Sequence, residues 1–230
     1  MTLTSNPPTN SRLDSDVIGS GLTLGSIHLW WADLARDEPE IGRFHDLISP
    51  VERDRAARFR EACSRRRFVT ARGILRTLLG RYLNEEPAEV SLTVGCFVKP
   101  RLEGEQPALY FNVSHADDLA VYAFAGECEV GVDLERTQEV VEWQAIATAL
   151  FTDSERALLH ALAGSERTTA FIRAWTRHEA LLKTQGHGLG GPRPANPATF
   201  SFCPIEPPAG FAAALAIEGP PAVVLDAGFL

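Results

Sequence analysis

The sequence predicts an α+β protein of two lobes. Short runs of strand-forming apolar residues alternate with longer segments in which apolar residues recur at helical spacing. Each half of the 230-residue chain runs from strands into helices and back to strands, although no tandem repeat is visible at short period. Helices and sheets of this kind bury their apolar faces against each other, so we expect two α+β lobes that divide near Cys128.

The part of the chain up to residue 134 is expected to contain the following helices and strands. Ser49-Pro50-Val51-Glu52 predicts a helix start, because Ser caps a helix, Pro fits its first position and an acid suits its first turn. Helices are also expected over residues 38–46 and 64–83. Strands are expected over residues 27–31, 90–98, 109–113, 119–125 and 130–134.

The second half is expected to continue with helices over residues 140–150, 154–163 and 168–185. From Phe200 onward, strand-like apolar runs alternate with Pro and Gly. Residues 1–25 are rich in Ser, Thr, Asn and Pro, which predicts a disordered tail. The predicted lobes are therefore residues 26–128 and 129–230.

Composition argues against several classes of protein. No apolar run approaches the ~20 residues that span a bilayer, and the start of the chain lacks the basic and apolar regions of a signal peptide. We therefore expect a cytoplasmic protein without a membrane partner. A net charge of −8 argues against general nucleic-acid binding. The cysteines form no CxxC pair and are predicted to be buried free thiols: Cys63, Cys96, Cys128 and Cys203.

Basic residues are distributed unevenly. Ten arginines lie between Arg53 and Arg81, while the whole chain has only two lysines, Lys99 and Lys183. Apolar residues recur at helical spacing within the arginine-rich span, so most of these arginines are expected on the solvent side of a helix. The alternative is an anion-binding patch, because planar guanidinium groups bind phosphate through two hydrogen bonds.

Two separate segments carry the acids that suggest chemistry. In the expected strand Gly131-Val-Asp-Leu-Glu135, Asp133 and Glu135 point to the same face and repel unless a cation lies between them. On the expected helix, Glu179 and Lys183 are four residues apart and share one face. Each feature has an ordinary alternative, namely a polar strand end and a surface ion pair. Together they predict a site for Mg²⁺ and a pyrophosphate.

A third segment, Phe111-Asn-Val-Ser-His115, places a Ser-His pair at a strand end. A hydrolase triad is disfavoured because the sequence has no G-x-S-x-G turn and no obvious acid partner. Phosphate contact by Ser114 and His115 is the preferred interpretation. The remaining histidines lack metal-ligand spacing such as H-E-x-x-H, and His28 is expected to be incidental.

These segments, in this order, resemble the Sfp-type 4′-phosphopantetheinyl transferases. The resemblance rests on the Ser-His pair, on Gly-Val-Asp-Leu-Glu and on Trp-Thr-x-x-Glu-Ala-x-x-Lys-x-x-Gly-x-Gly-Leu over residues 175–189. Residues 48–59 match the family's opening Ile/Leu-Ser-Pro-x-x-Arg-x-x-x-x-Arg-Phe motif. The family fold is a pseudo-dimer of two similar α+β lobes with the active site in the cleft between them, and this fold is expected here.

The resemblance implies transfer of the phosphopantetheine arm of coenzyme A to a serine of an apo acyl or peptidyl carrier protein, with release of adenosine 3′,5′-bisphosphate. It implies Mg²⁺ bound by Asp133, Glu135 and Glu179, with Glu179 also the candidate base, and Lys183 on the transferring phosphate. It also implies a monomer, and leaves open whether the carrier serves peptide, polyketide or fatty-acid synthesis. The family's coenzyme A-binding positions fall on Arg55, Arg67, Lys99, Ser114, His115 and Lys183.

Two positions depart from the family pattern. His178 stands where a lysine is usual, and Glu52 stands where a basic residue can occur. The ribose or the 3′-phosphate of coenzyme A is therefore expected to rely on Arg55 and on the cluster at residues 65–67. Two other functions stay open, a catalytically inactive relative that binds carrier proteins and a Mg²⁺-dependent phosphate or nucleotide hydrolase.

Overall fold

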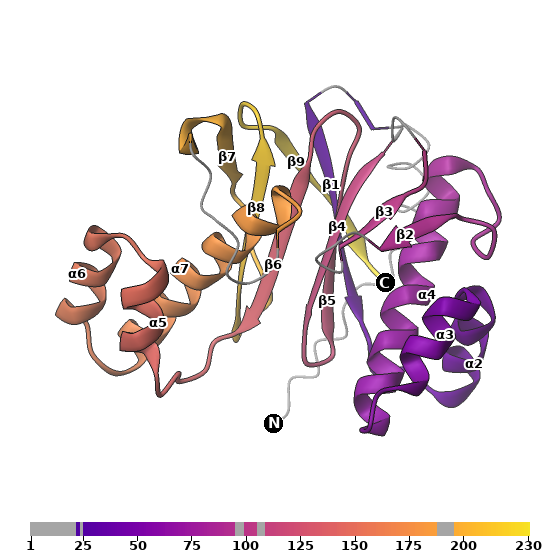
Figure 1. Cartoon of the computed structure of the whole chain (residues 1–230), viewed down its shortest axis with the longest axis horizontal. Helices are drawn as coiled ribbons and strands as arrows, with labels where there is room; N and C mark the ends of the chain where they lie inside the picture. The colour runs from indigo at the N-terminus through magenta and orange to yellow at the C-terminus, as the bar shows by residue number, and fades with distance from the viewer. Residues whose placement is uncertain (1–21, 24, 95–98, 105–108, 188–195) are drawn as a thin grey trace, which may run out of the picture.

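The computed structural model describes residues 22–23, 25–94, 99–104, 109–187 and 196–230. The α+β fold class is confirmed, since helices and sheets alternate along the chain (Figure 1). The helices are α2 (Glu38–Leu47), α3 (Pro50–Ala57), α4 (Ala62–Leu83), α5 (Trp143–Leu150), α6 (Asp153–Ala161), α7 (Gly164–Thr184) and the short 3-10 helix η1 (Pro197–Thr199). The strands are β1 (Ser26–Asp33), β2 (Leu92–Val94), β3 (Pro100–Leu102), β4 (Tyr110–Ala116), β5 (Leu119–Ala125), β6 (Val130–Arg136), β7 (Phe200–Cys203), β8 (Phe211–Glu218) and β9 (Val223–Phe229).

Two main sheets organise the molecule. One has the strand order β4-β5-β1-β9, the other β6-β8-β7, and a β2-β3 ribbon lies beside them. Their pairings are antiparallel except for β1 and β9, which run parallel. The last strand of the chain therefore belongs to the sheet that contains the first strand. The expected lobe boundary near Cys128 falls between β5 and β6, where the chain passes from one sheet to the other, and it stays a prediction.

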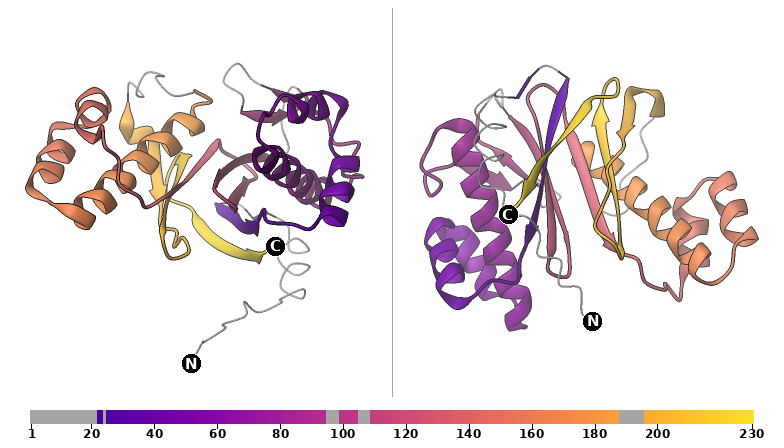
Figure 2. Two further views of the ribbon diagram at one scale, coloured as in Figure 1. Left: turned by 90° about the horizontal axis from the view of Figure 1, so that it is seen from below. Right: turned by 180° about the vertical axis from the view of Figure 1, so that it is seen from behind.

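The sheets and helices form successive layers, which Figures 1 and 2 show from several sides. Helix α4 covers one face of the first sheet, the second sheet packs against its other face, and α7 covers the second sheet. The sequence of β1 explains this arrangement. Both of its faces are apolar, with Trp30 directed to α4 and Leu29 and Trp31 directed to the second sheet.

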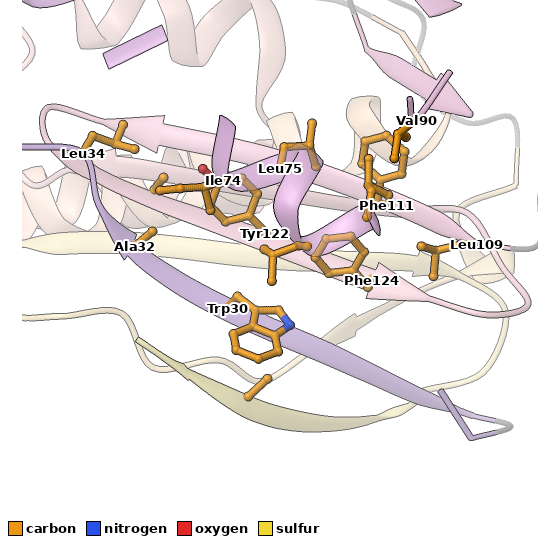
Figure 3. Close-up of a cluster of buried hydrophobic side chains, with 14 residues drawn as sticks. Trp30, Ala32, Leu34, Ile74, Leu75, Val90, Leu109, Phe111, Tyr122 and Phe124 are labelled. Atoms are coloured by element: carbon orange, nitrogen blue, oxygen red, sulfur yellow. The ribbon is translucent and has the colours of Figure 1, made fainter. Parts of the chain in front are cut away.

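The core under α4 is built from large aromatic residues and leucines of the helix (Figure 3). Trp30, Tyr122 and Phe124 are fully buried and pack against Leu75 and its neighbours. Their polar atoms are paired: the Tyr122 hydroxyl donates to the carbonyl of Ala71 over 3.0 Å. Because burial is this complete, α4 is held in one orientation, and its residues beside the sheet are fixed in place.

Most expected elements occur close to their predicted bounds, and the helix start at Ser49 is confirmed as a capping box closed by Glu52. The strand expected over residues 90–98 is shorter, since only Leu92–Val94 is a strand and residues 95–98 lie outside the described part of the chain. The β3 strand was not predicted. The tail expected over residues 1–25 lies almost wholly outside the described residues.

Two expectations about individual side chains require correction. Cys63 is exposed, because the buried face of α4 begins only at Val69; Cys203 is buried, and Cys96 lies outside the described residues. Arg72 and Arg76 lie on the buried face of α4 rather than on its solvent side. Among the helices that the structure describes, none is long and apolar enough to cross a membrane.

Candidate active site

The side chains of β4 join the two sheets at the site. Asn112 and Ser114 lie two residues apart on the same face of β4, and both are buried against β6. The amide oxygen of Asn112 accepts a hydrogen bond from the backbone N–H of Val132 at 2.8 Å, and Ser114 Oγ accepts one from that of Leu134 at 3.2 Å. These bonds fix β6 against β4, and so they fix the position of Asp133 between the two bonded residues.

A glycine allows α7 to lie against β6. A Cβ atom at Gly131 would lie 2.1 Å from the carbonyl oxygen of Ala180 and 2.4 Å from the backbone nitrogen of Thr184. No side chain fits there, because real Cβ contacts are not that short. The close approach brings the last turns of α7 beside the strand that carries the acids.

Lys183 and Asp133 form the centre of the site. Lys183 Nζ lies 2.6 Å from Asp133 Oδ1, 3.0 Å from Ser114 Oγ and 3.3 Å from the carbonyl oxygen of Val132. The Ser114 hydroxyl donates to Asp133 Oδ1 at 3.1 Å. One buried carboxylate, one hydroxyl and one ammonium therefore form a connected polar network at the meeting point of β4, β6 and α7.

The two other acids surround this centre. Glu135 Oε1 accepts a hydrogen bond from the Trp175 indole at 3.3 Å. Burial raises the pKa of Glu179 to about 7, with a further increase from the negative charges of Asp133 and Glu135 against the opposing effect of Lys183. Burial and the charge of Asp133 also raise the pKa of Glu135. The acids predicted from separate segments thus lie within electrostatic reach of each other.

The residues present fit a divalent metal by their chemistry. Asp133 Oδ2 and Glu179 Oε1 are buried oxygens without a hydrogen-bond partner among the described residues, and hard oxygen ligands are what Mg²⁺ prefers. In the described part of the chain, however, no group of three or more His, Cys, Asp or Glu side chains is already gathered closely enough to hold a metal. Asp133 Oδ1 is instead paired with Lys183. The three-acid metal site stays a prediction.

An open pocket of about 310 Å³ adjoins this centre. Glu179 and Lys183 of α7 lie on one wall, while Arg55, Phe68 and Arg72 of α3 and α4 lie on another. A hollow of about 390 Å³ beside Trp143 and Arg167 is lined by other residues and contains none of the acids. The pocket beside Lys183 is the candidate substrate site because it combines Glu179 with several cations.

His115 lines the pocket and is an exposed residue. Surrounding protein atoms lower its pKa, and the positive charges of Lys183, Arg67 and Arg72 lower it further. Arg67 itself donates to Asp118 Oδ1 at 2.7 Å and does not line the pocket. Both stand as predicted phosphate-binding residues near the pocket, although Arg67 has to leave Asp118 or bind through its remaining donors.

Lys99 reaches the site but uses its ammonium differently. Lys99 Nζ donates to Glu129 Oε2 at 2.9 Å, to the carbonyl oxygen of Val130 at 3.0 Å and to that of Lys183 at 2.9 Å. An ammonium has three donors, so protein acceptors occupy all of them. Direct contact between Lys99 and coenzyme A stays a prediction, and the observed contacts place Lys99 as a support for the end of α7.

Comparison with known proteins identifies the family. A model of the 4′-phosphopantetheinyl transferase superfamily matches residues 129–221, and a model of the N-terminal part of 4′-phosphopantetheinyl transferases matches residues 36–128. The chain is 35% identical over 165 residues to the 4′-phosphopantetheinyl transferase HetI of Nostoc sp.. The aligned residues make up 71% of this chain and 70% of HetI. The chain belongs to the 4′-phosphopantetheinyl transferase superfamily.

Other phosphopantetheinyl transferases match over smaller shares or at lower identity. Sfp of Bacillus subtilis is 27% identical over 159 residues, which is 69% of this chain and 68% of Sfp. AcpT of Salmonella typhimurium is 36% identical over 111 residues, which is 48% of this chain and 56% of AcpT. The two family models match adjacent segments, which agrees with the two-lobed architecture of this phosphopantetheinyl transferase.

Sequence reasoning missed two residues that the structure places at the site. Asn112 lies in the segment considered for catalysis, but its role in joining β4 to β6 depends on a pairing that no motif shows. Arg72 was one of ten similar arginines, and only the orientation of α4 against its sheet reveals that it is buried beside the pocket.

Proposed function

We propose that this phosphopantetheinyl transferase moves the 4′-phosphopantetheine arm of coenzyme A onto a serine of an apo carrier protein. Family membership supports the reaction, and the arrangement of Lys183, Asp133 and Glu179 beside a cationic pocket supports the site. The serine oxygen forms a bond to the β-phosphorus, and the bond from that phosphorus to the bridging oxygen breaks. Adenosine 3′,5′-bisphosphate then leaves with the electron pair.

The residues of the chain have distinct parts in this proposal. Lys183 presents a positive charge to the pyrophosphate from a position fixed by Asp133 and Ser114. Glu179 is the candidate base for the serine proton, directly or through water; without a bound metal, burial raises its pKa to about 7, and a full Mg²⁺ bond to the same carboxylate would lower this pKa again. Asp133, Glu135 and Glu179 would hold Mg²⁺, which when bound supplies positive charge for the leaving phosphate.

One incubation separates this function from the two other candidates. The protein is mixed with coenzyme A, Mg²⁺ and an apo carrier domain, and the carrier mass and free phosphate are measured. A phosphopantetheine mass shift on the carrier supports the transferase. Free phosphate without that shift supports a hydrolase, and neither product supports a binder of carrier proteins.

The role of Glu179 has its own test. Glu179→Gln should abolish transfer while coenzyme A binding stays measurable, because the amide is similar in shape but is no longer a base. The exposed Glu142→Gln is a matched control and should retain full transfer. Unchanged turnover in Glu179→Gln would remove this residue from the mechanism.

We further propose Mg²⁺ as the metal and a monomer that acts in the cytoplasm, with neither nucleic acid nor membrane as a partner. The carboxylate ligands support Mg²⁺. One chain supplies both walls of the pocket, from α4 and from α7, which supports a monomer. The net charge of −8 is unfavourable for binding to nucleic acid. Light scattering of the purified protein tests the monomer, and titration of Mg²⁺ against Mn²⁺ after chelation tests the metal.

A further inference from the structure

A separate groove lies on the other flank of α7 from the acids. It has a volume of about 330 Å³ and is lined by α7, by β8 and by the chain that follows β7; we call it the β8 groove. The strand order β6-β8-β7 places it at the opposite edge of the second sheet from Asp133. Among the described residues that line it, none is an acid of the candidate active site. The proposed reaction therefore leaves this groove without a role.

The sequence of β8 leaves room for the groove. Ala212 and Ala214 lie on the face of β8 that packs against α7, whereas Ala213 and Leu215 face the first sheet. Within the described residues, β7 pairs with β8 only as far as Cys203, which lies opposite Leu215. Short alanine side chains and the early end of β7 thus leave a shallow apolar floor beside α7.

The chain after β7 forms an apolar wall of this groove, which contains Pro204, Ile205 and Pro207. Proline fixes its own backbone angle φ, and the wall ends in a turn in which the N–H of Phe211 donates to the carbonyl oxygen of Pro208 at 3.2 Å. A wall that is already ordered loses little conformational entropy when a ligand binds.

Two arginines of α7 line the same groove. Arg173 and Arg177 are both exposed, and among the described residues neither side chain forms a hydrogen bond or an ion pair. The Arg177 Cζ atom lies 3.9 Å from the centre of the Phe202 ring. This contact covers one face of the guanidinium and leaves the N–H donors at its edge available for a carboxylate. Glu206 of the neighbouring wall is exposed and does not line the groove.

The spacing of the two arginines matches an extended peptide. Four residues of helix separate them, which corresponds to about 6 Å along the helix axis. Alternate residues of an extended chain lie about 6.6 Å apart and point to the same side. Two acidic side chains at alternate positions can therefore reach Arg173 and Arg177 together. The side chain between them then points away from α7, toward the apolar wall.

We propose that the β8 groove docks an extended segment of a partner protein with the pattern acid–apolar–acid. Charge complementarity supports this occupant, because two unpaired arginines stand beside an apolar wall in a chain of net charge −8. The groove holds only a few residues, so we expect a dissociation constant of roughly 10–100 μM. The inference goes beyond the proposed function and uses no residue of the candidate active site.

A labelled peptide tests the proposal directly. The probe is a fluorescent peptide with the sequence Ser-Glu-Val-Glu-Ser and blocked ends, and its binding is measured by fluorescence anisotropy. A peptide with Gln in place of both Glu residues should bind at least roughly tenfold more weakly, because it loses two charge-assisted contacts. Added salt should weaken binding of the acidic peptide, since exposed charges are screened.

Variants of the arginines locate the binding site. Arg177→Gln should weaken binding of the acidic peptide by about tenfold, and Arg173→Gln should weaken it several-fold. Arg81→Gln is the matched control, because it removes an exposed arginine of α4 that does not line the groove. Thermal unfolding of each variant is measured as well, and Arg173→Gln carries the test if Arg177→Gln does not fold.

Four results would overturn the proposal. The first is equal binding of the acidic and neutral peptides, and the second is unchanged binding in both arginine variants. The third is competition by glutarate as strong as that of unlabelled peptide, which would indicate a site for small dicarboxylates. The fourth is a dimer of the wild type in light scattering that the arginine variants lose, which would identify a second copy of the chain as the occupant.

A transfer assay keeps this inference distinct from the proposed function. Arg173→Gln and Arg177→Gln should retain the wild-type kcat/KM with coenzyme A and an isolated carrier domain, since the groove is separate from the acids. Loss of transfer in parallel with loss of peptide binding would contradict that separation. Absence of transfer by the wild type would refute the proposed function and leave the peptide measurements valid.

Discussion

The ammonium of Lys99 donates a hydrogen bond of 2.9 Å to the main-chain carbonyl of Lys183. The only two lysines of the sequence are therefore linked, one through its side chain and the other through its backbone. The carbonyls of the last helical turn have no partners within their own helix, and a basic side chain can supply one. Lys99 also bonds to Val130, so it fastens the end of α7 to the start of β6.

Lys99→Met should lower kcat more than it raises the KM for coenzyme A. The side chain that it removes holds the turn from which Lys183 reaches Asp133, while its three donors are used within the protein. The free energy of unfolding should fall by about 1–3 kcal/mol, because buried acceptors lose their donor. Urea unfolding and steady-state kinetics at several coenzyme A concentrations measure both effects.

Arg101→Met is the matched control for that substitution. Arg101 also pairs with Glu129, but its side chain is more exposed. We expect a small change in stability and near-normal kcat in the control. A large increase in KM for Lys99→Met with unchanged kcat would instead show that Lys99 contacts coenzyme A directly, as the family resemblance predicts.

Ser114→Ala should reduce kcat at least about tenfold, because the hydroxyl joins Lys183, Asp133 and the backbone of Leu134. Without it, the ammonium and the carboxylate lose the partner that fixes their relative position. The free energy of unfolding should also fall by about 1–3 kcal/mol. Single-turnover transfer and urea unfolding of the same preparation measure the two quantities.

Ser201→Ala separates the effect on the site from a general loss of stability. The Ser201 hydroxyl donates to the carbonyl oxygen of Gly219 at 2.6 Å and does not contact the acids. The Ser201→Ala substitution should lower the free energy of unfolding by about as much as Ser114→Ala does, while the activity per folded molecule is retained. If both serine variants lose activity in proportion to stability alone, Ser114 has no positioning role.

The features of the site that could be predicted from the sequence are those that local backbone geometry determines. Strand alternation placed Asp133 and Glu135 on one face, and helical spacing placed Glu179 and Lys183 on one stripe, since both follow from local geometry. The pairing of β9 with β1 was not predictable, because it joins residues nearly two hundred positions apart. The same holds for the burial of Arg72, which depends on how α4 is rotated against its sheet.

Gly131→Ala should destabilise the protein by about 1–3 kcal/mol or more and reduce transfer strongly. The added methyl would meet the backbone of α7 at 2.1 Å from Ala180 O, and backbone cannot yield as a flexible side chain does. The helix must move away from β6, which separates Lys183 from Asp133. Thermal unfolding and transfer kinetics at a temperature where the variant is folded give the two effects separately.

Gly42→Ala is the control for this steric argument. Gly42 lies within α2, and a Cβ atom there would meet nothing within 4 Å. Replacing a helical glycine by alanine should raise stability by about 0.5–1 kcal/mol and leave activity unchanged. A Gly131→Ala enzyme with normal stability and turnover would contradict the close packing of β6 and α7.

His28 should make the fold sensitive to acid. The residue is fully buried on β1, its Nδ1 atom lies 2.8 Å from the Tyr82 hydroxyl, and Nε2 has no partner among the described residues. Burial lowers the pKa of His28 below its ordinary value of 6.5. The unfolded chain therefore binds this proton more readily than the folded protein, so stability is lost as pH falls below about 6.5.

The comparison between wild type and His28→Leu isolates this contribution. Below pH 6.5 and above the folded pKa, His28 should cost wild type up to about 1.4 kcal/mol for each pH unit, and the variant should lack that part of the slope. Other titrating groups, Glu179 among them, contribute equally to both proteins and cancel. Urea unfolding at pH 5, 6 and 7 measures the slopes of the two proteins. Parallel slopes for wild type and His28→Leu would mean that His28 is protonated in the folded protein as readily as in the unfolded chain.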